Sequence, residues 1–164
     1  SELPNFIDPF KVESVDGFAM ILNLRKLKKV DQFKDNNFFD ENIFLYLEND
    51  DLCKRIRKYE NIFIVPKSKI NHLGASGVNK KYSEQIELSR NWHWIWSKFY
   101  FNKKHYGFIK AFFECFPSFL SAILKVLFYF LINSKKKGIY LHRVLGFLNA
   151  LLGKKSYHRP KIDN

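Results

Sequence analysis

The hydrophobic pattern of the first part of the chain predicts short strands and helices in alternation. Residues 14–24 form an apolar run with β-branched side chains and one glycine, which predicts a buried strand. Residues 25–34 are basic and predict a short helix or turn, and residues 48–59 predict a helix with an acidic first turn and a basic last turn. Residues 61–66 predict a short buried strand closed by proline. This order predicts an α/β layered domain.

The second part of the chain has the pattern of long helices. Residues 82–106 predict a helix that carries all three tryptophans, and residues 139–152 predict an amphipathic helix followed by a basic tail. Between them, residues 111–132 form a run of 22 residues, of which 17 are apolar. A helix of this length reaches about 33 Å, which is enough to cross a bilayer.

Three residues inside this apolar run argue against a simple membrane span. Glu114 and Lys125 would each cost a few kcal/mol at the bilayer centre, and Pro117 predicts a break near the start of the helix. Lysines flank both ends of the run, so charge marks neither end as the outside. We therefore expect in-plane or re-entrant helices, while a full crossing by residues 111–132 stays an open alternative.

Charge divides the chain in the same place as the hydrophobic pattern. Residues 1–66 have a net charge of −2, whereas residues 67–164 have a net charge of +14. A basic, aromatic surface suits either nucleic acid or an anionic membrane. The apolar run of residues 111–132 and the lack of a recognisable nucleic-acid motif disfavour the first. We expect no nucleic-acid partner and a location on the cytoplasmic face of a membrane, peripheral or in-plane.

Aromatic and basic residues of the second part are the candidates for membrane contact. Trp92 and Trp96 are four residues apart and share one helix face. The pattern is compatible with an interfacial aromatic anchor and equally with core packing, and it leaves both open. The expected membrane contacts are Trp92, Trp96, Lys103, Lys104, Phe112 and Phe116.

The densest group of carboxylates lies at the start of the helix predicted for residues 48–59. Glu48 and Asp51 are three residues apart and share a helix face, so they can divide the roles of general base and positioning group. Helix capping alone would also explain an acidic first turn. The aromatic, apolar residues 39–46 run directly into the cluster, which favours the functional interpretation because a helix needs no such lead-in to be capped.

Residues 39–56, FDENIFLYLENDDLCKRI, resemble the C-terminal catalytic motif of family 2 glycosyltransferases with the GT-A fold. That family commonly shows Phe-Asp-Glu, then Phe-Leu-Tyr, then Glu-Asp-x-Asp-Leu-Cys. Residues 15–20 (VDGFAM) resemble the strand before this motif. Residues 64–66 (IVP) and 70–74 (INHLG) resemble the strand and histidine-containing loop after it. As a set, the resemblance covers roughly residues 12–106.

The resemblance implies an α/β fold and a reaction. Residues 1–80 would be the C-terminal, acceptor-side part of a GT-A domain that carries the base, and residues 81–164 a membrane-associating helical region. Such enzymes invert configuration: an acidic residue takes a proton from an acceptor hydroxyl, which attacks the anomeric carbon of a nucleotide sugar. The implied partners are a nucleotide-sugar donor and a glycan or lipid-linked acceptor, as in polysaccharide biosynthesis. Mg²⁺ or Mn²⁺ would neutralise the leaving diphosphate, since hard oxygens prefer a hard cation.

Two departures from the family pattern shape the expected site. Asn49 stands where the family has an aspartate, and an amide cannot take a proton at neutral pH. The role of base then falls to Glu48, Asp50 or Asp51, of which we favour Glu48, with Asp51 positioning the helix. No Asp-x-Asp metal motif precedes Ser14, so we expect the C-terminal part of a longer enzyme, inactive by itself. The residues expected to bind substrate are Asp16, Gly17, Phe18 and Asn49.

Histidines supply one further candidate. His72 precedes a loop of small residues, 73–79, that suits close approach to a diphosphate, and in some GT-A enzymes a histidine after the last strand ligates the metal. His72 is therefore a candidate metal ligand, with a hydrogen bond to the loop backbone as the plainer alternative. The other four histidines are expected at the membrane interface or in solvent: His93, His105, His142 and His158.

A second class of function stays open at this point. A basic, non-catalytic membrane-binding protein, or an enzyme remnant that has lost activity, would show the same aromatic and basic second part. The two classes differ in whether the carboxylates of residues 48–51 perform chemistry.

Overall fold

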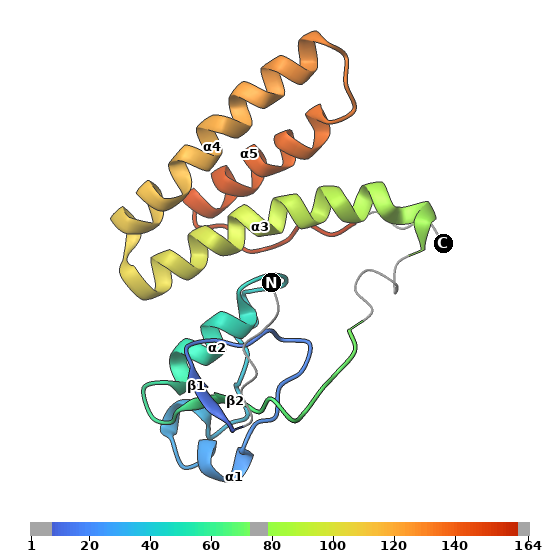
Figure 1. Cartoon of the computed structure of the whole chain (residues 1–164). Coiled ribbons are helices and arrows are strands. Elements are labelled where there is room, and N and C mark those ends of the chain that lie inside the picture. The colour runs from blue at the N-terminus through green and yellow to red at the C-terminus, as the bar shows by residue number, and fades with distance from the viewer. Residues whose placement is uncertain (1–7, 73–78, 161–164) are drawn as a thin grey trace. The chain divides into compact units, whose positions relative to one another are not determined.

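The computed structural model describes residues 8–72 and 79–160, and the chain divides into two compact units (Figure 1). The first unit comprises Ser1–Glu41 and Glu48–Ser76, and the second comprises Asn42–Leu47 and Gly77–Asn164. The short segment Asn42–Leu47 thus belongs to the second unit, although both its neighbours in sequence belong to the first.

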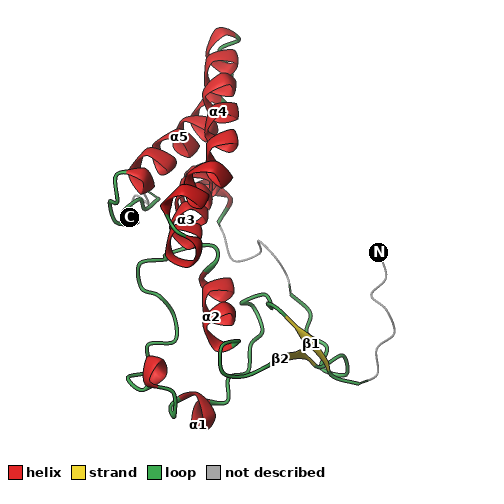
Figure 2. Cartoon of the chain, turned by 90° about the vertical axis from the view of Figure 1, so that its left-hand side faces the viewer, coloured by secondary structure: helices red, strands yellow, loops and turns green. Residues whose placement is uncertain are grey.

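The first unit consists of short helices and strands (Figure 2). Their side chains form a small apolar core. Strand β1 pairs antiparallel with strand β2, with Phe10 opposite Ile64 and Val12 opposite Ile62. Side chains from the helices close the core, which contains Leu27, Phe33, Leu52 and Ile56. In chain order the elements are β1 (Phe10–Val12), α1 (Leu24–Leu27), the 3₁₀ helix η1 (Asp31–Phe33), α2 (Glu48–Ile56) and β2 (Ile62–Ile64).

The expected GT-A α/β fold is wrong. The structure is mostly helical, with 55% helix and 4% strand, and a GT-A domain would need a larger central sheet than this two-stranded one. The strand predicted for residues 14–24 does not form, and Ile21 within it is 99% exposed. The backbone there bonds to a side chain of α2 instead, because Asn49 Nδ2 donates to the carbonyl oxygen of Val15 at 2.8 Å.

The other elements predicted for the first unit are confirmed in outline. The helix predicted for residues 48–59 is α2, which ends at Ile56, and the basic segment 25–34 contains α1 and η1. The strand predicted for residues 61–66 is β2, but it is not buried, since Phe63 is 53% exposed.

The second unit is a bundle of three helices. After the 3₁₀ helix η2 (Lys80–Tyr82) come α3 (Ser83–Tyr106), α4 (Phe108–Leu131) and α5 (Lys137–Leu151), which confirm the three predicted long helices. Gly107 joins α3 to α4 with φ at 91°, a conformation that glycine adopts without strain. The segment from Lys154 to His158 returns along α3 (Figure 1).

The predicted break at Pro117 is wrong, because α4 continues through it. Proline removes one backbone donor from the ladder. Packing on both sides compensates, since Ala111 and Cys115 before the proline and Ala122 after it are buried. Pro117 itself lies on the exposed side of the helix.

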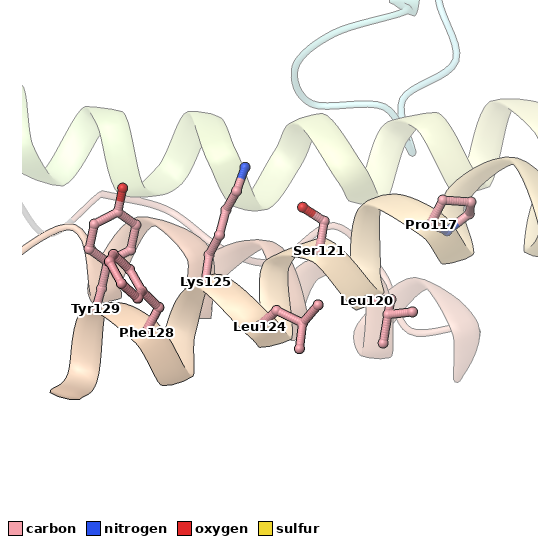
Figure 3. A pocket seen from close by; sticks show the side chains of 7 residues that line it. All are labelled: Pro117, Leu120, Ser121, Leu124, Lys125, Phe128 and Tyr129. Carbon is pink, nitrogen blue, oxygen red and sulfur yellow. The ribbon is translucent and has the colours of Figure 1, made fainter.

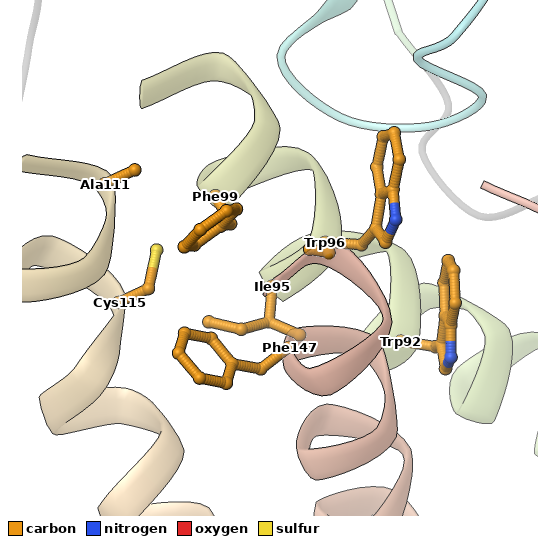
Figure 4. Close-up of a cluster of buried hydrophobic side chains, with 8 residues drawn as sticks. Trp92, Ile95, Trp96, Phe99, Ala111, Cys115 and Phe147 are labelled. Carbon is orange, nitrogen blue, oxygen red and sulfur yellow. The ribbon is translucent and has the colours of Figure 1, made fainter. Parts of the chain in front are cut away.

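Aromatic side chains fill the core of the three-helix unit (Figure 4). Trp92 and Trp96 are 1% and 3% exposed and stack with their ring centroids 6.3 Å apart, so the core-packing alternative holds for both. Trp94 is the exposed one of the three indoles, at 37%. The buried cluster comprises Trp92, Ile95, Trp96, Phe99, Ala111, Cys115, Phe147 and Ala150.

Candidate functional site

Glu48 is the first residue of α2 and follows a strained stretch of backbone. Tyr46 and Leu47 have φ angles of 69° and 66°. This left-handed conformation costs a non-glycine residue about 1–3 kcal/mol, and strained residues of this kind cluster at active sites, ligand clamps and switch regions. The Oε2 atom of Glu48 is buried and has no hydrogen-bond partner among the described residues. A buried acceptor without a donor costs stability, so the position is suited to a group that meets a ligand or a proton.

The second unit holds the segment that leads into Glu48. Ser97 of α3 donates its hydroxyl to the carbonyl oxygen of Leu45 at 2.7 Å. The guanidinium carbon of Arg159 lies 3.5 Å from the centre of the Phe44 ring. Leu45 and Phe44, which precede the strained residues Tyr46 and Leu47, are therefore held by α3 and by the C-terminal segment.

Asn49 and Asp50 fix the loop 14–18 to the start of α2. Ser14 Oγ donates to Oδ1 of Asp50 at 2.5 Å, and the Asn49 amide donates to Val15 as described above. Gly17 lies close to the same side chain, since a Cβ placed on it would be 3.5 Å from the Cβ of Asn49. The loop that carries the predicted substrate-binding residues Asp16, Gly17 and Phe18 is thus attached to the helix that begins with Glu48.

Asp51 points into the first unit. It is 0% exposed, and its Oδ2 accepts a hydrogen bond of 2.8 Å from Nε of Arg55, which is 6% exposed. Arg55 also donates to the backbone carbonyl oxygen of Phe38. This buried ion pair, through the bond of Arg55 to Phe38, connects α2 to an earlier segment of the first unit.

His72 stacks on Phe18. The ring centroids are 4.7 Å apart with an angle of 15° between the planes, and both side chains are exposed. Across the described residues, no three His, Cys, Asp or Glu side chains gather in a way that could hold a metal ion. Those residues do not fit the implied divalent cation by themselves, and the metal-binding role of His72 stays a prediction. Residues 73–78 of its loop lie outside the described residues.

The prediction for the surroundings of His93 is wrong. Expected at an interface or in solvent, this histidine is 0% exposed and accepts a hydrogen bond of 3.0 Å at Nδ1 from Ser156 Oγ. Its Nε2 lies 2.7 Å from the backbone carbonyl oxygen of His158. A carbonyl can only accept, so Nε2 carries a proton, and Nδ1 accepts from Ser156 when the ring is neutral. Burial is the main cause that lowers the pKa of His93 from 6.5 to about 4.

The neighbouring His158 is half-buried, and burial lowers its pKa also, assisted by His142 and Arg159. No local pattern could have revealed these contacts, because His93 and its partners are more than 60 residues apart in the sequence. Both histidines bind the C-terminal segment to α3 rather than face an open cavity.

Helix α4 carries an apolar face that the rest of the unit leaves exposed. By length and composition, α4 is long and apolar enough to cross a bilayer, and it is the one such helix found in residues 8–72 and 79–160. Of the predicted membrane contacts, Lys103 and Lys104 are exposed, Phe116 is 37% exposed and Phe112 packs partly against the core. The large exposed apolar residues of α4 include Phe113, Leu120, Leu124, Leu127, Phe128, Phe130 and Leu131.

Comparisons with protein-family models, with curated proteins and with solved structures find no match to this chain.

Proposed function

We propose that this chain supplies the catalytic base of a membrane-associated glycosyltransferase, and that Glu48 is the base. The observation that carries the proposal is the buried Oε2 of Glu48, which has no donor among the described residues, directly after two strained residues. The resemblance of residues 39–56 is the basis for the type of reaction, and the hydrogen-bond partners of the other α2 carboxylates favour Glu48 as the base.

The neighbours of Glu48 in the motif have other partners. Asp50 accepts a hydrogen bond from the hydroxyl of Ser14, and Asp51 accepts one from the guanidinium of Arg55. Asn49 cannot accept a proton, and its amide is bonded to Val15. Glu48 is therefore the best placed of the three carboxylates to receive a proton from a substrate.

The reaction requires one proton transfer and one substitution. Oε2 of Glu48 takes the proton from a hydroxyl of the acceptor. The oxygen of that hydroxyl attacks the anomeric carbon of the donor sugar at the same time. The bond from that carbon to the nucleotide diphosphate breaks, and the configuration inverts. The exposed stack of Phe18 on His72 offers an aromatic face to the acceptor sugar. A divalent cation and the nucleotide-sugar donor belong to the proposal, with His72 as a candidate ligand and no complete ligand set among the described residues.

The decisive experiment compares the transfer activity of a Glu48 variant with that of the same substitution at another glutamate. Full-length protein in its native membranes is assayed for transfer of labelled sugar from a panel of nucleotide sugars. Glu48→Gln should lose about 10²–10⁴-fold in turnover, the usual contribution of a general base. Glu60→Gln is the control, because Glu60 is partly exposed and pairs only with Lys26 at 3.4 Å within the described structure. Glu48→Gln turnover within about threefold of wild type would remove Glu48 as the base.

The second part of the proposal places α3, α4 and α5 on an anionic membrane surface, in-plane and on the cytoplasmic side. The exposed apolar face of α4 accounts for insertion, and the net charge of +14 over residues 67–164 accounts for attraction to anionic lipid. Glu114 and Lys125 are exposed on α4, and each would cost a few kcal/mol at the centre of a bilayer.

Single cysteines test this arrangement directly. The native Cys53 and Cys115 are buried, so an impermeant thiol reagent should report Lys104→Cys and Lys136→Cys. We expect both positions to react from the cytoplasmic side, and high salt or carbonate to release part of the protein. Reaction from opposite sides would establish a crossing by α4 and contradict the in-plane arrangement.

The non-catalytic alternative gives a different set of results. A basic membrane-binding protein would bind anionic vesicles and show no transfer with any donor, and Glu48→Gln would then change neither property. The favourable observation for this alternative is the exposed, basic and apolar character of the second unit, which requires no catalysis.

A further inference from the structure

Cationic and aromatic side chains alternate across the surface of the three-helix unit. Lys125 of α4 has its Nζ 5.0 Å from the centre of the Tyr140 ring on α5. The guanidinium carbon of Arg143 lies 5.4 Å from the same ring and 5.2 Å from the ring of Trp94 on α3. Tyr129 stacks on Tyr140 with the ring centroids 5.5 Å apart and the planes 7° from parallel. One tyrosine ring therefore holds two cations in place.

In the part of the chain that the structure describes, these two cations have no anionic partner. Within the described ranges, neither Lys125 nor Arg143 forms an ion pair with a carboxylate. Arg143 uses its Nε to donate to Oδ1 of Asn91 at 2.8 Å, which leaves its two terminal nitrogens for another acceptor. Two positive charges beside one ring repel each other, so an anion between them would be bound favourably.

An open groove of about 640 Å³ lies along α4, and Lys125 is one of the residues that line it. Figure 3 shows that Ser121, Lys125 and Tyr129 project on one side of the helix, whereas Leu120, Leu124 and Phe128 project on the other. The first row is polar, and the second is apolar and about half exposed. The groove thus has two walls: a polar wall of Ser121, Lys125 and Tyr129, and an apolar wall of Leu120, Leu124 and Phe128.

We propose that this groove binds a single anionic phospholipid, with its phosphate at Lys125 and Arg143. The Ser121 and Tyr129 hydroxyls supply further donors to the headgroup, and an acyl chain lies along Leu120, Leu124 and Phe128. The proposal rests on the membrane association proposed above and adds to it a defined lipid site. It also gives Lys125, the charge that argues against a span, a role at headgroup depth.

The two walls together favour lipid over other occupants. Free phosphate would use the cations and leave the apolar row exposed to water. A second copy of the chain would bring a surface of the same positive charge against this one, since residues 67–164 carry a net charge of +14. A phospholipid matches both walls, because its anionic headgroup and its acyl chain are joined.

The experiment measures binding of full-length protein to vesicles of phosphatidylcholine, with and without phosphatidylglycerol. Lys110→Gln is the matched control, because Lys110 is also on α4 and also lies over an aromatic ring, that of Tyr106 at 4.2 Å, but outside the groove. Loss of one surface charge should weaken binding about fivefold in the control. Lys125→Gln should weaken it about tenfold more, since a charge-assisted hydrogen bond to the phosphate is also lost. Lys125→Arg should restore the affinity.

Each other outcome has a distinct meaning. Equal losses in Lys125→Gln and Lys110→Gln would overturn the lipid site and leave general membrane attraction intact. A saturable change in fluorescence on adding inorganic phosphate alone, abolished by Lys125→Gln, would assign the groove to free phosphate. Self-association that Lys125→Gln abolishes would assign it to a second copy. Loss of sugar transfer by Glu48→Gln is independent of all three results.

Discussion

Gly146 of α5 lies directly against the backbone of Trp92 in α3. A Cβ atom on this glycine would overlap the carbonyl oxygen of Trp92 and would lie 2.9 Å from Cγ2 of Ile95. The carbonyl belongs to a helix and cannot move aside in the way a flexible side-chain end can. The close contact of α3 with α5 therefore depends on hydrogen in place of a methyl group at this position.

Gly146→Ala is expected to destabilise the three-helix unit by about 1–3 kcal/mol or more, the usual cost of overpacking. The matched control is Gly138→Ala, at the start of the same helix, where the added Cβ would meet only the end of the Leu88 side chain at 3.5 Å. That change should be neutral or stabilising by up to about 1 kcal/mol, because alanine favours helix. Chemical denaturation of both variants checks this, and equal stabilities would contradict the close contact.

The stability of the second unit should fall in mild acid. The pKa of His93 is about 4 in the folded protein and 6.5 as its ordinary value, so the unfolded chain binds the proton more tightly. The stabilisation is complete above pH 6.5 and is lost as pH falls toward 4, by at most about 3 kcal/mol. Denaturation across this pH range measures it.

His93→Gln separates this residue from the other titrating groups. A glutamine amide can donate to the carbonyl of His158 and accept from Ser156, but it cannot titrate. The variant should show a flatter dependence of unfolding free energy on pH between about 6.5 and 4. The lowered pKa of His158 acts in the same direction and remains in the variant. A slope unchanged from wild type would refute the role of His93.

Asp51→Asn should destabilise the first unit by about 3–5 kcal/mol, because it leaves the buried guanidinium of Arg55 without its counter-charge. Asp31→Asn is the control, since Asp31 pairs with Lys34 on the surface with 88% of its side chain exposed. Surface pairs contribute little, so its effect should stay below about 1 kcal/mol. Urea unfolding followed by circular dichroism distinguishes the two. Comparable effects would mean that the buried pair contributes no more than a surface one.

Asn49→Asp tests the hydrogen bond that joins the loop 14–18 to α2. An ionised aspartate cannot donate to the Val15 carbonyl, and it would place two acceptors where the amide now bonds at 2.8 Å. We expect a loss of about 1–3 kcal/mol at neutral pH that becomes smaller in acid, where a protonated carboxyl can donate. Asn61→Asp, at an exposed position, should have little effect. If Asn49→Asp were as stable as wild type, the amide would not be what holds the loop.

The sequence predicted helices well because their signals are local. The acidic and basic ends of α2 and the long runs of α3, α4 and α5 lie within each helix, and their periodicity survives folding. The strand expected for residues 14–24 failed because an apolar, β-branched run needs a neighbouring strand. Here Ser14 and Val15 bond to side chains of α2 instead, which no pattern within the run could indicate.

The sequence could name the candidate carboxylates but not their partners. The motif pointed to Glu48, Asp50 and Asp51 together, and spacing alone gave no means to separate them. Their separation depends on Ser14 and Arg55, which take two of the three carboxylates as partners. The sequence likewise left Trp92 and Trp96 undecided, because a shared helix face does not reveal what covers it.

All three tryptophans lie within five consecutive residues of α3, so the intrinsic emission of the protein originates in one helix. Trp92 and Trp96 are shielded from water, while Trp94 is partly open to it, so emission from this helix should combine a blue and a red component. The first unit carries no tryptophan and therefore contributes no tryptophan emission. Tryptophan fluorescence can therefore follow the second unit of the unlabelled chain alone, and a difference between its melting curve and that of a probe placed in the first unit would show that the units unfold independently.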